Sequence, residues 1–160
     1  MIIRKATTDD LPAMLEIFAK ARKFMQSKGN SDQWGSSYPE REIIENDIAL
    51  GESYVCVEDE QILATFVLAM GEDSTYLVID GAWKNDRPYG TIHRVAASGA
   101  RGGMTDIIFE WAFDQAGNLR GDTHEDNHLM QRAFERGGFE PCGTIWVKDG
   151  SPRLAYQRER

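Results

Sequence analysis

The chain has 160 residues, 41% of them hydrophobic, and 26 acidic against 18 basic residues give it a formal net charge of −8. This composition predicts a single globular domain over residues 1–160 and excludes a disordered chain, and no apolar run approaches the ~20 residues of a membrane span. The acidic balance disfavours nucleic acid and membranes as partners. Two cysteines far apart in the sequence predict a reduced, cytoplasmic protein, and the polar N-terminus predicts that there is no signal peptide.

The first half of the sequence predicts helices followed by strands. The first helix is capped by Thr8 or Asp9 and tolerates Pro12 in its first turn, and its apolar residues recur at helical spacing. In chain order, the predicted elements are a strand at 2–5, a helix ending at 28–30, a loop at 31–38, a helix from Pro39 to about Leu50, and strands at 54–57 and 62–70.

The second half predicts a strand–helix–strand–helix unit and a final hairpin. The elements are a strand or irregular segment at 76–79, a loop at 83–89, a strand at 92–97, a glycine-rich turn at 98–103, helices at 104–115 and 127–136 around a strand at 119–123, and a hairpin of 144–147 with 154–156. This order predicts a mixed sheet covered by helices, an α+β (α/β mixed) fold.

The glycine-rich turn Ser98-Gly99-Ala100-Arg101-Gly102-Gly103 is the most informative feature. A turn of this kind that opens a helix collects backbone N–H groups at the positive end of the helix dipole, which suits a phosphate. A P-loop is excluded because the turn has no lysine, and a dinucleotide fingerprint is excluded by the glycine spacing. The pyrophosphate of coenzyme A is the third candidate ligand.

Two motifs carry a resemblance to a known family. The run Ala100-Arg101-Gly102-Gly103-Met104-Thr105 resembles motif A of the GCN5-related N-acetyltransferases (GNAT), Gln/Arg-x-x-Gly-x-Gly/Ala. The run Asn127-x-x-Met130-x-x-x-Phe134-x-x-Gly137-Gly138-Phe139 resembles their motif B, Asn-x-x-Ala-x-x-x-Tyr-x-x-x-Gly-Phe. The order of elements matches as well, so the resemblance covers nearly the whole chain. Ala100 and Thr105 depart from motif A, and Arg101 restores a cation.

The resemblance implies a central mixed, mostly antiparallel sheet with a splayed strand pair, flanked by about four helices. The strands ending near Ala97 and Thr123 would separate to admit acetyl-CoA. The edge Val95-Ala96-Ala97 would pair with the pantetheine arm, and the amides of Arg101, Gly102, Gly103, Met104 and Thr105 would wrap the pyrophosphate. Asn127 would bond the pantetheine or the acceptor side of the cleft.

Acetyl transfer to an amine needs a base, a group that polarises the thioester carbonyl, and a thiolate that leaves. His93 is the first candidate base, because strand alternation places it on the same face as Val95 and Ala97; a buried structural histidine is an equal reading. A backbone N–H of the splayed strand could polarise the carbonyl. The general acid is unassigned, because Phe134 occupies the position of the family's tyrosine.

The segment from Asp122 to His128 is a second group of candidate functional residues. Asp122, His124 and His128 have the residue types of metal ligands, but His124 precedes the helix, so the two histidines do not share a helical face, and no metal is expected. His124 is instead a second candidate base. Thr123 or Asp126 is a candidate helix cap. Cys142 is read as a thiol acid, a substrate-facing residue or a small buried hydrophobe.

Trp34 and Trp83 are candidates for an acceptor pocket, since aromatic faces attract cations, and Asp32 and Asp86 are candidate attractors for an amine. The function expected is direct transfer of an acetyl group from acetyl-CoA to a small-molecule amine. The oligomeric state stays open: the resemblance implies that a homodimer is one option, with the C-terminal strands as its contacts. Two alternatives stay open: a non-catalytic acyl-CoA sensor of the same fold, and a metal-dependent hydrolase.

Overall fold

The computed structural model describes all residues from 1 to 160. Eight strands form one sheet in the order β1-β2-β3-β5-β6-β8-β7-β4, and only the pair β5–β6 is parallel. The strands are β1 (Ile2–Lys5), β2 (Ser53–Glu58), β3 (Gln61–Met70), β4 (Asp80–Gly81), β5 (Gly90–Ala97), β6 (Asn118–Thr123), β7 (Glu140–Trp146) and β8 (Pro152–Glu159). The helices are α1 (Leu11–Ser27), α2 (Arg41–Ala49), α3 (Met104–Ala116) and α4 (His128–Arg136). The predicted α+β fold and its four helices are confirmed.

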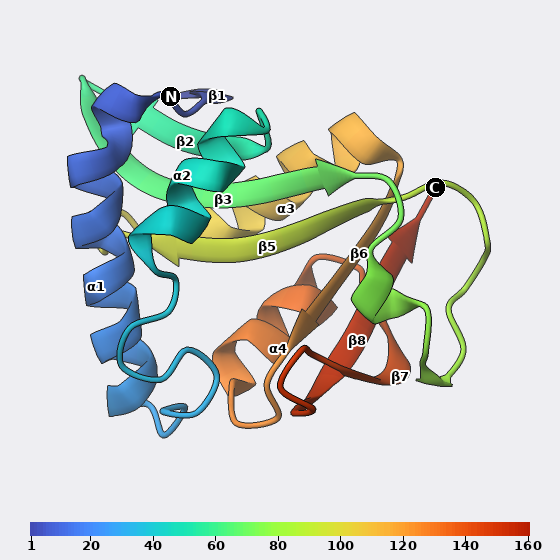
Figure 1. Cartoon of the computed structure of the whole chain (residues 1–160). Helices are drawn as coiled ribbons and strands as arrows, with labels where there is room; N and C mark the ends of the chain where they lie inside the picture. The colour runs from blue at the N-terminus through green and yellow to red at the C-terminus, as the bar shows by residue number, and fades with distance from the viewer.

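Two hydrophobic cores hold the layers together. Helices α1 and α2 lie in front of the sheet and α3 behind it (Figure 1). On the α1–α2 side, Met14 and Ile44 pack with Ala96 of β5. On the α3 side, Phe109 packs with Phe134 of α4, which explains why α3 and α4 share one face. Strand β5 therefore contributes to both cores.

Three predicted boundaries are wrong for local reasons. The helix cap predicted at Thr8 or Asp9 is replaced by a short 3-10 turn at Thr8–Asp10, where the Thr7 N–H donates to Asp10 Oδ2 at 2.8 Å. The second helix begins at Arg41 rather than at Pro39. Of the two readings of 76–79, the strand is wrong: a 3-10 turn at Ser74–Tyr76 precedes the two-residue edge strand β4.

Strands β5 and β6 separate almost as soon as they meet. They pair only at Gly90–Leu119 and Thr91–Arg120, while β5 continues along β3 as far as Ala97 and β6 continues along β8 as far as Thr123. Figure 1 shows the two strands diverging. The residues of β5 after Thr91 therefore have no strand partner on the β6 side, and the predicted splayed pair is confirmed. None of the helices combines the length and the apolar character that a membrane span requires.

Candidate active site

The glycine-rich turn presents unused backbone donors. Helix α3 begins at Met104. The first N–H of this helix that donates to a backbone carbonyl is that of Ile107, and its acceptor is Gly103 O. The N–H groups of Arg101 to Thr105 donate to no protein acceptor, whereas that of Ala100 donates to Ser98 Oγ at 3.2 Å. Free donors at a helix N-terminus, where the helix dipole is positive, favour an anionic ligand.

Two arginines frame these donors. A cavity of about 240 Å³ lies at the turn and is lined by Ala97, by the residues from Arg101 to Asp106 and by Arg136. Arg136, at the end of α4, pairs with Asp106 at 2.9 Å, so the carboxylate in the first turn of α3 is neutralised. Arg101 is paired with Glu58 of β2 at 2.8 Å and remains 45% exposed. Sequence reasoning found Arg101 but missed Arg136, whose approach depends on how α4 packs.

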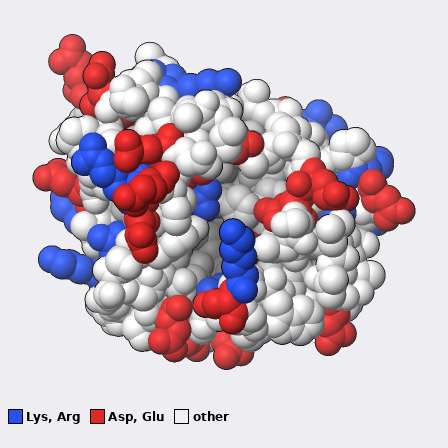
Figure 2. Space-filling view, viewed as in Figure 1, with Lys and Arg blue, Asp and Glu red and all other residues white.

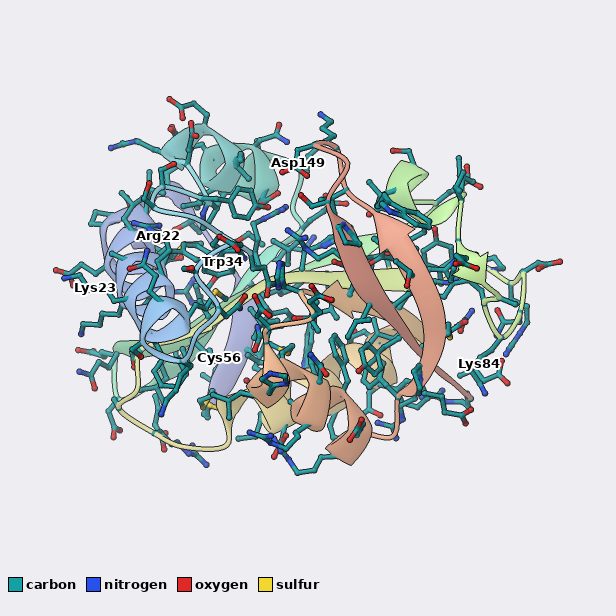
Figure 3. All side chains as sticks on the ribbon, turned by 90° about the horizontal axis from the view of Figure 1, so that it is seen from below. Arg22, Lys23, Trp34, Cys56, Lys84 and Asp149 are labelled. Carbon is teal, nitrogen blue, oxygen red and sulfur yellow. The ribbon has the colours of Figure 1, made fainter.

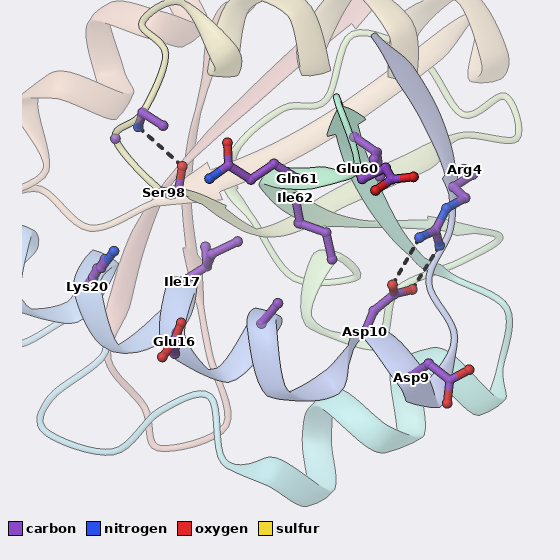
Figure 4. Close-up of a pocket in the computed structure, with 14 residues that line it drawn as sticks. Arg4, Asp9, Asp10, Glu16, Ile17, Lys20, Glu60, Gln61, Ile62 and Ser98 are labelled. Carbon is purple, nitrogen blue, oxygen red and sulfur yellow. Dashed lines mark hydrogen bonds and ion pairs between the residues drawn. The ribbon is translucent and has the colours of Figure 1, made fainter.

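A second, larger cavity lies on the other side of the turn. It measures about 730 Å³, and α1, the β2–β3 hairpin and Ser98 to Ala100 form its walls (Figure 4). Acidic side chains outnumber basic ones in its lining, and one of the basic ones, Arg4, is bound by Asp10 at 2.8 and 3.0 Å. This lining suits a phosphate less well than the amide-lined cavity does.

The strand segment Val95-Ala96-Ala97 borders the gap between β5 and β6. Its side chains are used for packing, with Ala96 in the core under α1 and the other two against the core under α3. What the segment offers to a ligand is therefore its backbone edge, as a strand offers it to an added strand.

A bulge changes which way His93 faces. Ile92, Val95 and Ala97 all pack against the core under α3, which strict alternation from Ile92 would not allow. The alternation slips at Arg94, whose φ is +49° and where the register between β3 and β5 shifts. His93 therefore faces the side opposite Val95 and Ala97, and the prediction that the three share a face is wrong.

His93 forms a pair with a carboxylate that sequence reasoning missed. Its Nε2 lies 3.0 Å from Asp73 Oδ2, and the two side chains are 25% and 23% exposed. Asp73 also accepts from the N–H and hydroxyl of Thr75, and its own N–H donates to the Tyr89 hydroxyl at 2.8 Å. The hydrogen bond with His93 holds the pKa of Asp73 well below its usual range despite burial. A histidine that is oriented by a carboxylate and partly exposed to solvent is suited to accept a proton.

A tyrosine–aspartate pair is buried beside this histidine. Tyr76 is 2% exposed, its ring centroid lies 6.4 Å from that of His93, and its hydroxyl donates to Asp122 Oδ2 at 2.5 Å. Burial raises the pKa of Asp122, and burial together with that carboxylate raises the pKa of Tyr76. The Asp122 carboxylate is thus already hydrogen-bonded to Tyr76 within the protein.

The start of α4 is tied to the loop between α1 and α2. Asn127 caps α4, because its Oδ1 accepts from the Met130 N–H at 3.0 Å, while its Nδ2 donates to Gln33 Oε1 at 3.1 Å. Gln33 Oε1 also lies 3.3 Å from both Thr123 Oγ1 and the His124 N–H. The cap is therefore neither Thr123 nor Asp126. Asn127 has one partner at each end of its carboxamide, which leaves a second N–H and a second lone pair for the expected bond to pantetheine.

The alternative metal-ligand trio, Asp122, His124 and His128, does not assemble. The three-residue group whose ligand atoms lie within 4.8 Å of one another is Asp32, His124 and Asp126, not Asp122 with His124 and His128. His124 Nδ1 accepts from the Asp126 N–H at 3.0 Å, which satisfies the ring nitrogen within its own loop.

The two candidate acceptor tryptophans lie apart. Trp34 is 7% exposed and packs against Phe18 and Tyr38, so it belongs to the core. In Figure 3 it lies beside α1, whereas Lys84, which follows Trp83, is at the other end of the molecule. Trp83 is half-buried and stacks under the Arg120 guanidinium at 4.2 Å. The two do not form a common pocket.

Phe134 and Cys142 fill structural positions. Phe134 is 2% exposed and stacks on Phe109 and Tyr156, with centroids 4.9 and 4.7 Å away. Cys142 packs partly buried beside the small cluster around Tyr76, and burial raises the pKa of its thiol. A thiol with a raised pKa stays protonated and is a weak nucleophile.

The face seen in Figure 1 is hollowed near its centre, and basic and acidic side chains lie close together around the hollow (Figure 2). The net charge of −8 is therefore not concentrated at this opening. Whatever enters it meets charges of both signs, so acceptor choice does not follow from net charge.

Solved structures share this architecture. A GNAT-family acetyltransferase from Streptococcus agalactiae is 29% identical with a TM-score of 0.91, and the match covers 99% of this chain and 95% of that one. Over nearly its whole length, the chain is thus similar in fold and sequence to a GNAT-family acetyltransferase. A GNAT-family acetyltransferase from Listeria monocytogenes is 19% identical, with a TM-score of 0.74 over 99% of this chain and 94% of that one.

More distant similarity supports the fold alone. An aminoglycoside acetyltransferase solved with coenzyme A and kanamycin is 19% identical, with a TM-score of 0.64 over 99% of this chain and 94% of that one. No family model and no curated protein matches the sequence. The similarity to the Streptococcus agalactiae structure is what supports an acetyltransferase.

Proposed function

We propose that this protein transfers an acetyl group from acetyl-CoA directly to the amine of a small molecule. The observation that carries the proposal is the combination of free amides from Arg101 to Thr105 with the gap between β5 and β6. The pyrophosphate would bind the amides, with Arg136 and Arg101 as nearby cations. The pantetheine arm would lie along the backbone of Val95 to Ala97 and carry the thioester toward His93.

His93 is assigned as the base. The acceptor nitrogen attacks the carbonyl carbon, its proton passes to His93, the carbon–sulfur bond breaks, and coenzyme A leaves as a thiolate. Asp73 would orient the ring and stabilise the charge that develops on it. His124 is the weaker candidate, because its Nδ1 is already bonded within its own loop.

No protein group is needed to protonate the leaving sulfur, because a thiolate is a fair leaving group. Phe134 cannot donate, and the Tyr76 hydroxyl is buried and donates to Asp122. These two facts also favour the second candidate function, a sensor that binds an acyl-CoA without turning it over.

One experiment separates these functions. Acetyl-CoA binding is measured by calorimetry, and a panel of small amines is then screened by detecting the thiol of released coenzyme A, with mass spectrometry of the amine. Binding with an acetylated product supports the transferase. Binding without product across the panel supports the sensor. Absence of binding refutes both.

A further inference from the structure

Arg94 has an unusual backbone conformation at the point where the ladder between β3 and β5 is interrupted. Thr65 pairs with Ala96 and Val67 with His93, so two residues, Arg94 and Val95, lie opposite one residue of β3. This two-against-one count defines a β-bulge, which leaves one residue outside the ladder. The φ of Arg94, +49°, is in the left-handed region that a β-carbon disfavours.

The Arg94 side chain is held from the α2 side of the sheet. Its Nε and one terminal nitrogen each donate to Asp47 of α2 at 2.7 Å, and its other terminal nitrogen donates to the Tyr38 hydroxyl at 2.9 Å. The arginine side chain is 16% exposed and the aspartate 7%. Burial alone would lower the pKa of Arg94, but the bonds to Asp47 and Tyr38 outweigh it and the pKa is raised.

A strained backbone persists only where its surroundings determine it, and such strain is concentrated at functional sites. A planar guanidinium bound at both ends of its fork is a rigid tether. Here the tether joins the bulge to Asp47 of α2 and to Tyr38, which lies three residues before α2 begins.

A backbone N–H of the splayed strand is already the group expected to polarise the thioester carbonyl of acetyl-CoA. We propose that Arg94, Asp47 and Tyr38 form a clamp that holds the β5 bulge in its shape, and with it that N–H, at Arg94 or Val95. This inference rests on the proposed function. The bulge lies between the base, His93, and the pantetheine edge that begins at Val95, which is where the thioester must lie. The three side chains are positioning residues, because they act through the backbone they hold.

The test uses acetyl-CoA labelled with carbon-13 at the acetyl carbonyl, so that no acceptor is needed. Isotope-edited infrared spectroscopy reports the carbonyl stretch, and calorimetry reports the dissociation constant. In the wild-type complex we expect the band to shift to lower frequency than in free acetyl-CoA. In Arg94→Lys and Tyr38→Phe it should return toward the free position, while the dissociation constant changes by less than about threefold, because the amides that hold the pyrophosphate are untouched.

Turnover gives a second measurement once the screen has found an acceptor. We expect kcat to fall about tenfold in Arg94→Lys with KM for acetyl-CoA nearly unchanged, less than the ~10²–10³ loss when a donor is removed outright. Tyr38→Phe removes one hydrogen bond and leaves the ion pair, so it should fold even if Arg94→Lys does not.

Asp10→Asn is the matched control. It breaks another two-point arginine–carboxylate pair, Arg4 with Asp10, whose aspartate side chain is 9% exposed and which lines the larger cavity instead (Figure 4). It should lower stability and leave the carbonyl band unchanged.

Three results would overturn the clamp. They are a bound wild-type complex with an unshifted carbonyl, a Tyr38→Phe complex that keeps the full wild-type shift, and a control that loses the shift as the clamp variants do. Each of these leaves acetyl-CoA binding intact and so leaves the proposed function standing. Failure of the wild type to bind acetyl-CoA would instead remove both.

Discussion

Gly102 and Gly103 are neighbours in the glycine-rich turn, yet the structure predicts that alanine has a different effect at each. Gly103 has φ +76°, so an alanine there would cost about 1–2 kcal/mol of folding stability. Gly102 has no positive φ, and a β-carbon built on it meets no atom within 4 Å. Gly102→Ala is therefore expected to keep stability or to gain about 0.4–1 kcal/mol through a less flexible unfolded chain.

The same methyl group should impair cofactor binding. It would project into open space at the cavity of about 240 Å³, which the pyrophosphate occupies in the proposed complex. If it displaces the phosphate from one amide, the loss of a charge-assisted hydrogen bond is about 1.5–3 kcal/mol, or roughly 10- to 150-fold in the dissociation constant. Gly102→Ala should thus fold at least as well as the wild type while binding coenzyme A at least tenfold more weakly.

The assay is thermal unfolding of each variant together with calorimetric titration of coenzyme A. Gly150→Ala is the control, because Gly150 has φ +86° and open space around it but lies in the β7–β8 turn, outside the glycine-rich turn. It should lose stability as Gly103→Ala does and keep its affinity. Equal affinity of Gly102→Ala and the wild type would show that this turn does not wrap the pyrophosphate.

Three other predictions concern the base and the core. His93→Gln should lower kcat/KM about 10²–10⁴-fold at pH 7 and recover in part at high pH, where the acceptor amine loses its proton in solution; an unchanged pH–rate profile would contradict the assignment. The folded pKa of Asp73 lies below its unfolded value, so its stabilising effect is complete above about pH 4 and lost as pH falls; the difference in unfolding free energy between wild type and Asp73→Asn should shrink from pH 6 to pH 3. Gly121→Ala should cost about 1–3 kcal/mol in denaturant unfolding, because its β-carbon would lie 2.8 Å from the Phe134 ring and 3.2 Å from Ile92; unchanged stability would show that the ring can move aside.

The helices, the strands and the glycine-rich turn were largely predictable because their sequence signals are local. Two glycines followed by helix-forming residues mark a helix start within a few positions, and α3 begins at Met104 as predicted. The partners of the candidate base, His93, and of the bulge residue, Arg94, were not predictable in this way. Asp73 lies 20 residues from His93, and Asp47 lies 47 residues from Arg94. No motif marks either aspartate, since tertiary packing alone brings them to β5.

The error over His93 has a definite physical origin. Alternation assumes one residue on each strand per step, and the extra residue at the bulge reverses the faces of everything before it relative to everything after it. Arginine is not a residue whose presence suggests a left-handed backbone, so the sequence carries no local sign of the bulge. Trp34 illustrates a different difficulty: large aromatic residues in loops are commonly buried against the core, as Trp34 is. Trp83 stays a prediction.

Strand β5 and the turn that follows it carry the proposed chemistry in chain order. His93 comes first, then the bulge at Arg94, the backbone edge from Val95 to Ala97, and the free amides from Arg101. At about 3.3 Å per residue, one strand fixes the spacing from base to thioester and from thioester to pyrophosphate. The loop after α1, by contrast, reaches the end of β6 and the start of α4 through Gln33, while α2 reaches β5 through the pair between Asp47 and Arg94. Substitutions in that loop should therefore leave the backbone geometry of β5 unchanged, provided that the bond between Asp47 and Arg94 is kept.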